Sequence, residues 1–301
     1  MNKPKIYIDG QAGTTGLEIV MRLSNREDIE LLKIPEDKRH DDQFRKEYMK
    51  NADLVFLCLP DEASKKAMEL MDEHTKVIDA STAHRIDPDW VYGFPELSKA
   101  QKEKIKSCNR LANPGCHATG FISIVYPLIK NHVIKNDTIL SCTSLTGYSG
   151  GGKAMISQYE SDKTIDLYAP RLYGLSLQHK HLKEMKEICH LTKDPLFCPV
   201  VDDYYRGMLT TIMIEADKDE IFQLYHTFYQ DTFIEVSKEE ESYLSSNLYA
   251  KKDNLKICVH GNNKQVMISA LFDNLGKGAC GAAIQNMNLM LGFEEYKGLI
   301  Y

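Results

Sequence analysis

The feature that most constrains the fold is a short apolar strand at the N-terminus, followed by three regularly spaced glycines and then a helix. Residues 6–9 form a short, largely apolar predicted strand, and residues 17–23 have helical periodicity. Between them, Gly10, Gly13 and Gly16 form the pattern GxxGxxG. Such glycines let the backbone turn tightly, approach a pyrophosphate and pack against the helix, whose N-terminus attracts the anion. The order of strand, glycine loop and helix predicts a dinucleotide-binding unit of the Rossmann type. The alternative is a tight turn that binds no ligand.

The residues after the second predicted strand indicate which dinucleotide would bind. The usual fingerprint has an acidic residue about 20 positions further on, which holds the ribose 2′-hydroxyl of NAD. After the strand at residues 30–34, this chain instead has the adjacent cations Lys38 and Arg39. Two cations favour a 2′-phosphate, so we expect NADP, with a solvated loop as the alternative. In this unit we predict that the cofactor is bound by Gly10, Gly13, Thr14, Thr15, Gly16, Lys38 and Arg39.

The remaining pattern predicts two domains of different architecture. Strands at residues 53–59 and 76–79, with a helix at 63–71 between them, continue the strand-helix alternation of a parallel α/β sheet. From residue 138 the strands are longer and lack this alternation, which predicts an α+β domain on a mostly antiparallel sheet. These strands cover residues 138–145, 209–214, 255–259 and 265–271. With an apolar helix at 282–291 returning to the first domain, we expect a dinucleotide-binding domain of residues 1–115 plus 282–301 and a catalytic, substrate and oligomerisation domain of residues 116–281.

Composition excludes several classes of protein. The chain has 301 residues, a net charge of −6 and no long cluster of Lys and Arg, which argues against a nucleic-acid partner. No segment approaches the roughly 20 apolar residues of a membrane span, and no signal-peptide core precedes the first strand. The eight cysteines show neither a CxxC pair nor zinc-site spacing. We therefore expect a cytoplasmic protein that acts on a small molecule, with reduced cysteines, no bound metal and no membrane or nucleic-acid partner.

Cys116 follows a sharp turn and precedes an apolar helical segment. Pro114 and Gly115 mark the turn, and residues 121–125 are the apolar run. A thiol near the positive end of a helix has its pKa lowered from roughly 8.5 toward neutrality, as a nucleophile requires. The alternative is an inert cysteine that packs as a small apolar side chain.

Two histidines are the best candidates for proton transfer beside such a thiol. His181 lies three residues before Glu184, at the start of a helical pattern through residue 188, and His179 lies two residues earlier. Both could instead be surface histidines of a solvated turn. His117 is adjacent to the thiol in sequence, but neighbouring residues on a helix do not face each other, so it ranks third.

A glycine-rich loop at residues 147–153 offers backbone N–H groups and a cation to an anionic substrate group, although a flexible hairpin has the same composition. We expect the substrate to contact Asn113, Ser149, Gly150, Gly151 and Lys153.

Together these motifs resemble those of the N-acetyl-gamma-glutamyl-phosphate reductases, in their shorter form, from end to end of the chain. The resemblance is carried by the N-terminal glycine motif, Asn113-Pro114-Gly115-Cys116-His117-Ala118-Thr119, the Gly-Tyr-Ser-Gly-Gly-Gly-Lys loop, His179-Lys180-His181-x-x-Glu184-Met185 and the segment 273–279. The cysteine motif is the most specific of these, because the related aspartate-semialdehyde and glyceraldehyde-phosphate dehydrogenases place their thiol in a different local sequence.

The resemblance implies an NADP-binding Rossmann-type domain, a substrate domain of the glyceraldehyde-phosphate dehydrogenase type, and a dimer or tetramer. It implies reduction of N-acetyl-glutamyl-5-phosphate to the 5-semialdehyde in arginine biosynthesis, with Cys116 as the nucleophile and the acid/base at His181. Members often carry proline where this chain has Lys183, so the choice between His179 and His181 stays open.

The chemistry also follows from the residue types: a thiolate displaces phosphate from an acyl phosphate, and NADPH reduces the resulting thioester. We expect the nicotinamide side of the cleft to be shaped by Ser81, Asn274 and Gly276. The alternatives are an aspartate-semialdehyde-type dehydrogenase, a nucleotide-binding sensor with an inert cysteine, and an oxidoreductase that transfers hydride directly without a covalent intermediate.

Overall fold

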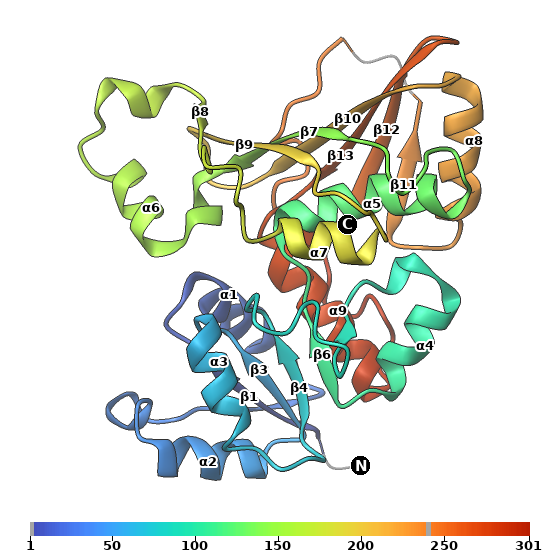
Figure 1. The fold of residues 1–301 in the computed structure, drawn as a ribbon. Coiled ribbons are helices and arrows are strands. Elements are labelled where there is room, and N and C mark those ends of the chain that lie inside the picture. The colour runs from blue at the N-terminus through green and yellow to red at the C-terminus, as the bar shows by residue number, and fades with distance from the viewer. Residues whose placement is uncertain (1–2, 239–241) are drawn as a thin grey trace. The chain divides into compact units, whose positions relative to one another are not determined.

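The computed structural model describes residues 3–238 and 242–301, and the chain divides into two compact units (Figure 1). The first unit comprises the chain up to Pro114 together with Ala282–Leu299. The second comprises Gly115–Gly281 with the last two residues.

In the described part of the first unit, six strands form a parallel sheet in the order β2-β1-β3-β4-β6-β5. The chain winds from β1 to β2 on one side and then to β3 on the other, so the winding reverses between β1 and β3. Ligands of such sheets bind at this reversal, outside the carboxyl ends of the strands. The strands are β1 (Lys5–Asp9), β2 (Glu30–Leu32), β3 (Leu54–Leu57), β4 (Lys76–Asp79), β5 (Val91–Tyr92) and β6 (Arg110–Ala112).

The helices of this unit connect the strands. Two of them begin at side-chain caps: Asp41 accepts hydrogen bonds from the first turn of α2, and Ser98 does the same for α4. The helices are α1 (Thr14–Leu23), α2 (Asp42–Asn51), α3 (Asp61–Met68), α4 (Lys99–Ser107) and α9 (Gly281–Leu291), with short 3₁₀ helices at Glu36–Lys38 and Pro95–Leu97. The helix expected at 63–71 begins earlier, because Pro60 and the acidic residues that follow it favour a helix N-terminus.

In the described part of the second unit, seven strands form a sheet in the order β11-β12-β13-β10-β7-β9-β8. Most neighbours are antiparallel, which confirms the predicted character of this sheet, but β11 pairs with β12 and β7 with β9 in parallel. The strands are β7 (Ser141–Gly147), β8 (Arg171–Leu172), β9 (Leu196–Asp202), β10 (Met208–Glu215), β11 (Ile234–Ser237), β12 (Leu255–Gly261) and β13 (Gln265–Phe272).

One strand boundary and one whole strand of this unit depart from the sequence analysis for identifiable reasons. The strand expected from residue 138 begins at Ser141, because a turn closes between Thr138 and Lys135. Strand β9 was not predicted, since it contains Pro199, which lacks the N–H of a regular strand residue.

Helices cover one face of this sheet. Helix α5 packs on β13, β10 and β7, and it also contacts α7 and α8 (Figure 1). The contact is close at Gly120, where an added Cβ would lie 2.2 Å from Thr210 Oγ1. The helices are α5 (Cys116–Lys130), α6 (Gly152–Glu160), α7 (Leu182–Ile188) and α8 (Lys218–Phe228), with 3₁₀ helices at Tyr148–Gly151 and Ile165–Tyr168 and a π-helical turn at Gly276–Cys280. Within the described ranges, no helix has the length and apolar character needed to cross a membrane.

Candidate active site

Cys116 is the first residue of α5, the longest helix of its unit among those described. Its neighbour Gly115 is the extended N-cap residue and has no side chain with which to cap the helix. Cys116 is half-buried, and its thiol lies at the helix N-terminus, where the helix dipole stabilises a negative charge. Cys116 thus lies at a helix start, as predicted, and this position favours the thiolate form of its side chain.

Glu184 fixes the turn before the thiol. This residue lies in the first turn of α7, its side chain is 2% exposed, and its Oε2 accepts a hydrogen bond of 3.2 Å from the Gly115 N–H. The contact joins two segments 69 residues apart in sequence. The sequence analysis used Glu184 only as a marker of the helix start, because no local pattern shows a long-range partner.

His179 and His181 lie next to each other at the start of α7. His181 is the N-cap residue of this helix, and its backbone N–H donates to Nδ1 of His179 over 3.2 Å. The ring centroids are 4.7 Å apart and nearly perpendicular. His181 is 5% exposed and His179 is half-buried, so the surface-histidine alternative is wrong for His181.

His117 completes this group of imidazoles, but its nitrogens are already engaged. Its ring centroid lies 5.5 Å from that of His179 and 5.8 Å from that of His181. Burial lowers the pKa of His117 to about 3, with smaller contributions from His179 and Lys180. Such a weak base is a poor proton acceptor near neutral pH, in agreement with its third rank among the candidates.

Gly278 allows a close approach to the nucleophile. It lies in the π-helical turn, where a Cβ would be 2.9 Å from the Cβ of Cys116 and 3.1 Å from the carbonyl oxygen of Asp273. Only a residue without a side chain fits between these atoms. The sequence shows the glycine but not the partner that requires it.

The glycine-rich loop is ordered and not a hairpin. Its first half forms the 3₁₀ helix Tyr148–Gly151, and α6 follows directly. Ser149 is buried, and its Oγ accepts a hydrogen bond of 2.8 Å from Asn274 Nδ2, while Asn274 Oδ1 accepts one from the Gly207 N–H. The other predicted substrate contacts in this loop, Gly150, Gly151 and Lys153, are exposed.

The π-helical turn contains another predicted cofactor residue. The N–H of Gly276 donates to Asp273 Oδ1 over 3.2 Å, and Asp273 is fully buried. Asn274 and Gly276 are thus held by contacts within the second unit, and their role toward a nicotinamide stays a prediction.

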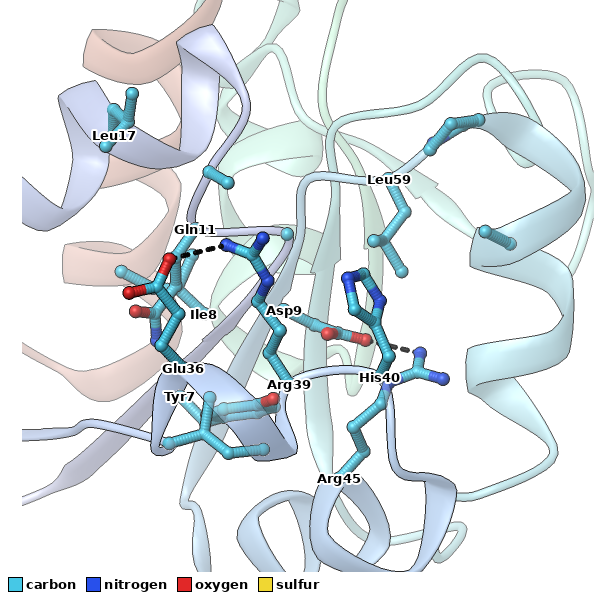
Figure 2. A pocket seen from close by; sticks show the side chains of 15 residues that line it. Tyr7, Ile8, Asp9, Gln11, Leu17, Glu36, Arg39, His40, Arg45 and Leu59 are labelled. Atoms are coloured by element: carbon cyan, nitrogen blue, oxygen red, sulfur yellow. Dashed lines mark hydrogen bonds and ion pairs between the residues drawn. The ribbon is translucent and has the colours of Figure 1, made fainter.

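The first unit contains a cavity of about 660 Å³ where its sheet topology reverses, at the carboxyl ends of β1 and β3 (Figure 2). Gly10, with φ +87°, and Gly16, where a Cβ would lie 2.3 Å from the Gly10 carbonyl oxygen, both require glycine. Helix α1 begins here at Thr14, with Gly13 at its N-cap. The N-terminus of this helix has the polarity that suits a pyrophosphate. The cavity is lined by Tyr7, Ile8, Asp9, Gly10, Gln11, Ala12, Leu17, Ile34, Glu36, Arg39, His40, Arg45, Leu59, Pro60 and Ala63.

The cavity offers one of the two predicted cations to a ligand. Arg39 lines it and pairs loosely with Glu36 at 3.4 Å (Figure 2). Lys38 is not a lining residue and packs over the Phe44 ring. Arg45 was not predicted; it lies 2.6 Å from Asp9, so its charge is already paired. Of the two predicted cations, only Arg39 lines the cavity, and its role toward a 2′-phosphate stays a prediction.

The end of β4 carries a second polar cluster of this unit. Asp79 is fully buried, and its carboxylate accepts hydrogen bonds from the Ser81 N–H and hydroxyl. His84 Nδ1 also lies 2.6 Å from this carboxylate. Asn113 is adjacent: its N–H donates to the Asp79 carbonyl, and its own carbonyl accepts from Arg85 Nε over 3.0 Å. Ser81 and Asn113 are thus held in one hydrogen-bonded cluster, organised by an aspartate that the sequence analysis did not select.

A half-buried cysteine at a helix start, two adjacent imidazoles and a cavity where a parallel sheet reverses its winding are features expected of a nicotinamide-dependent dehydrogenase of the semialdehyde type. Family models agree: "semialdehyde dehydrogenase, NAD binding domain" matches residues 5–106, and "semialdehyde dehydrogenase, dimerisation domain" matches residues 116–274. Solved structures share the fold at low identity. Aspartate semialdehyde dehydrogenase II from Vibrio cholerae has a TM-score of 0.71 and 17% identity, covering 97% of this chain and 99% of that one. The enzyme from Candida albicans, with NADP, has a TM-score of 0.66 and 12% identity, covering 96% and 99%.

Sequence relatives narrow the class to one family. The N-acetyl-gamma-glutamyl-phosphate reductase of Brucella ovis is 43% identical over 308 residues, which cover 96% of this chain and 99% of that protein. N-acetyl-gamma-glutamyl-phosphate reductase 2 of a Nostoc species is 41% identical, covering 99% of this chain and 100% of that protein. The chain belongs to the N-acetyl-gamma-glutamyl-phosphate reductase family.

Proposed function

We propose that this chain reduces N-acetyl-glutamyl-5-phosphate to N-acetyl-glutamate-5-semialdehyde and phosphate, with NADPH as the reductant, in cytoplasmic arginine biosynthesis. The observation that carries the proposal is the place of Cys116 at the first residue of α5, with two imidazoles nearby in the same unit. Relatives that bear the name of this activity match nearly the whole chain. The structural likeness to aspartate semialdehyde dehydrogenases supports the fold alone, because those identities are below 20%.

The first half-reaction forms a thioester. The Cys116 thiolate attacks the acyl carbon, a C–S bond forms, and the C–O bond to phosphate breaks with its electron pair leaving on phosphate. The N-terminus of α5 stabilises the attacking thiolate, and the hydrogen bond from Gly115 to Glu184 keeps this turn in place.

The second half-reaction releases the aldehyde. When bound in the first unit, NADPH supplies the hydride that reduces the thioester carbonyl. His181, or His179 in its place, donates a proton to the resulting oxyanion and takes it back as the carbonyl re-forms. The C–S bond breaks in the same step in which the carbonyl re-forms, and its electron pair returns to the sulfur of Cys116.

Arg39 supports NADP as the cofactor. Its guanidinium lines the cavity, and only one of its terminal nitrogens contacts Glu36, at 3.4 Å, so the guanidinium can pair with a 2′-phosphate. Arg45 lies deeper and supports the wall of the site through its ion pair with Asp9.

We propose that the protein forms a homo-oligomer. The contact uses the face of the second unit's sheet that is opposite helix α5. On β10, Thr210 faces α5, so Leu209, Thr211 and Met213 face the other way. Met213 is 70% exposed and pairs with Met267 of β13. The exposed Met213 on this face and the match to a dimerisation domain support contact with a second copy. Light scattering at micromolar concentration, with Met213→Glu as the variant, tests this state.

One assay tests the proposed function. We expect phosphate-dependent reduction of NADP with N-acetyl-glutamate semialdehyde, and little activity with aspartate semialdehyde. Cys116→Ser should lose activity by several orders of magnitude. Parallel His179→Asn and His181→Asn variants assign the acid/base, which we expect at His181. Equal rates with aspartate semialdehyde would favour the sister dehydrogenase, and a Cys116→Ser variant of near-normal rate would favour direct hydride transfer.

A further inference from the structure

The side chain of His179 holds the backbone of His181 at the start of α7. The backbone N–H of His181 donates to Nδ1 of His179, two residues earlier in the chain, over 3.2 Å. The carbonyl oxygen of His179 accepts a hydrogen bond of 3.0 Å from the Leu182 N–H, and that of His181 accepts one of 3.0 Å from the Met185 N–H. The ring and the carbonyl of His179 thus close one turn, in which the backbone of His181 is bound on both sides.

Neighbouring rings fix the orientation of the His179 ring. It packs edge-on against Phe197 of β9, with the ring centroids 5.2 Å apart, and against His117, with the centroids 5.5 Å apart. The ring of Tyr173 lies 6.0 Å away, also edge-on. Aromatic rings in such contacts have preferred orientations, so the imidazole resists rotation about its own axis. Nδ1 therefore stays directed at the N–H of His181.

The hydrogen bond determines where the proton of a neutral His179 ring lies. A ring nitrogen that accepts an N–H carries no proton, so the neutral ring has its proton on Nε2. The lone pair that could take a proton from a substrate is the one on Nδ1, which already faces His181. A doubly protonated ring would have N–H groups at both nitrogens and would lose this bond. His179 can therefore exchange a proton only by releasing the backbone of His181.

The third imidazole of the group is also engaged within the fold. His117 is 2% exposed, and its Nδ1 lies 2.7 Å from the hydroxyl oxygen of Ser144. Its Nε2 lies 2.5 Å from the phenolic oxygen of Tyr173. Two of the three rings thus have structural contacts at the nitrogens that proton transfer would need, which assigns the proton transfer to His181.

We propose that His179 is a positioning residue, whose Nδ1 holds the backbone of His181 so that the His181 ring stays in place as the acid/base. The inference rests on the proposed function, in which a histidine gives a proton to the oxyanion and takes it back. His179 acts only through its neighbour. Without an acceptor at this place, the N–H of the buried residue His181 loses its partner, and the turn has to rearrange to supply another.

Asparagine and leucine at position 179 separate the positioning role from an acid/base role. The side-chain oxygen of asparagine accepts the N–H two residues further along the chain in an Asx turn, so it can replace Nδ1. Leucine has nearly the same shape as asparagine but offers no acceptor. Neither side chain exchanges protons near neutral pH, so an acid/base at position 179 would be lost equally in both variants.

The readout is steady-state kinetics of the full chain with N-acetyl-glutamate semialdehyde, phosphate and NADP. We expect His179→Leu to lower kcat about 10–100-fold, the cost of a misplaced catalytic group, and His179→Asn to recover most of this loss. KM should change little in either variant, because substrate binding is not impaired. Both limbs of the pH profile of kcat should persist in His179→Asn, whereas His181→Asn should lose one. His226→Asn, at an exposed histidine of α8, is the control for a histidine-to-asparagine change.

The outcomes distinguish this proposal from the function on which it rests. If the unaltered protein does not reduce NADP with this semialdehyde and phosphate, the proposed function itself is contradicted. If the unaltered protein is active, equal kcat values of the asparagine and leucine variants would overturn the positioning role, whether both are low or both are normal. Loss of a limb of the pH profile in His179→Asn would overturn it too. The asparagine variant keeps the buried N–H satisfied, so its pH profile decides the matter even if the leucine variant fails to fold.

Discussion

The carboxylate of Glu184 holds the backbone of Gly115, and so ties the start of the histidine-bearing helix α7 to the turn before the nucleophile. A charged acceptor for a buried N–H makes a stronger bond than a neutral one. This contact therefore helps to fix the placement of the thiol relative to the imidazoles within the second unit.

Removing this carboxylate should impair both stability and catalysis. We predict that Glu184→Ala lowers the free energy of unfolding by about 1–3 kcal/mol, since the Gly115 N–H is left buried without its acceptor. Its kcat should fall at least tenfold, whereas Glu184→Gln keeps an acceptor oxygen and most of the activity. Urea unfolding measures the stability, and steady-state kinetics the kcat, of the unaltered protein and the two Glu184 variants. A Glu184→Ala variant with normal kcat would contradict the prediction.

A methyl group at Gly278 should disturb the nucleophile directly. The added Cβ of Gly278→Ala would lie 2.9 Å from the Cβ of Cys116, so either the π-helical turn or the start of α5 must move. We expect a loss of about 1–3 kcal/mol in stability, as is usual for overpacking, together with slower alkylation of Cys116. Gly13→Ala is the stability control, because its Cβ would approach no atom closer than 3.5 Å. Equal stabilities of the two variants would argue against the close approach.

Arg39 and Lys38 form a matched pair for testing cofactor choice. Arg39→Ala should raise the KM for NADP by about tenfold, which corresponds to the loss of roughly 1.4 kcal/mol of charge-assisted hydrogen bonding. The KM for NAD should hardly change, because NAD has no 2′-phosphate. Lys38→Ala, at the neighbouring cation outside the cavity, should leave both constants near their starting values. If Lys38→Ala has the larger effect, our choice between the two cations is wrong.

His117 should make the protein sensitive to mild acid. The unfolded chain protonates this ring below pH 6.5, while the folded chain keeps it neutral to about pH 3. Protons thus favour the unfolded state between these values, and stability decreases as the pH falls through this window. Between pH 7 and pH 5 the unaltered protein should lose about 2 kcal/mol more than His117→Gln, measured by urea unfolding at both values. Equal losses would show that the ring is not kept neutral.

Local sequence signals predicted the parts of the site that lie within one segment. The glycine spacing after β1 and the Pro-Gly turn before Cys116 both act through the backbone of adjacent residues, so their structural consequence can be read from the sequence. The start of α7 at His181 followed in the same way from helical periodicity.

Contacts between distant segments could not be predicted. Glu184 meets Gly115 across 69 residues, and the place of Gly278 beside Cys116 is set by tertiary packing. The adjacent residues Lys38 and Arg39 look equivalent in sequence, yet the end of a 3₁₀ helix directs only Arg39 to the cavity. The buried acceptor Asp79 was overlooked because an aspartate at the end of a strand carries no signal of what it will bind.

The central claim is that the sulfur of Cys116 carries the acyl group during turnover. The most direct measurement mixes the protein with NADP and N-acetyl-glutamate semialdehyde without phosphate, and identifies the modified peptide by mass spectrometry. The account predicts a burst of NADPH close to one per site and the mass of one N-acetyl-glutamyl group on Cys116, both abolished in Cys116→Ser. Steady phosphate-dependent turnover with no acyl group on Cys116 would contradict it.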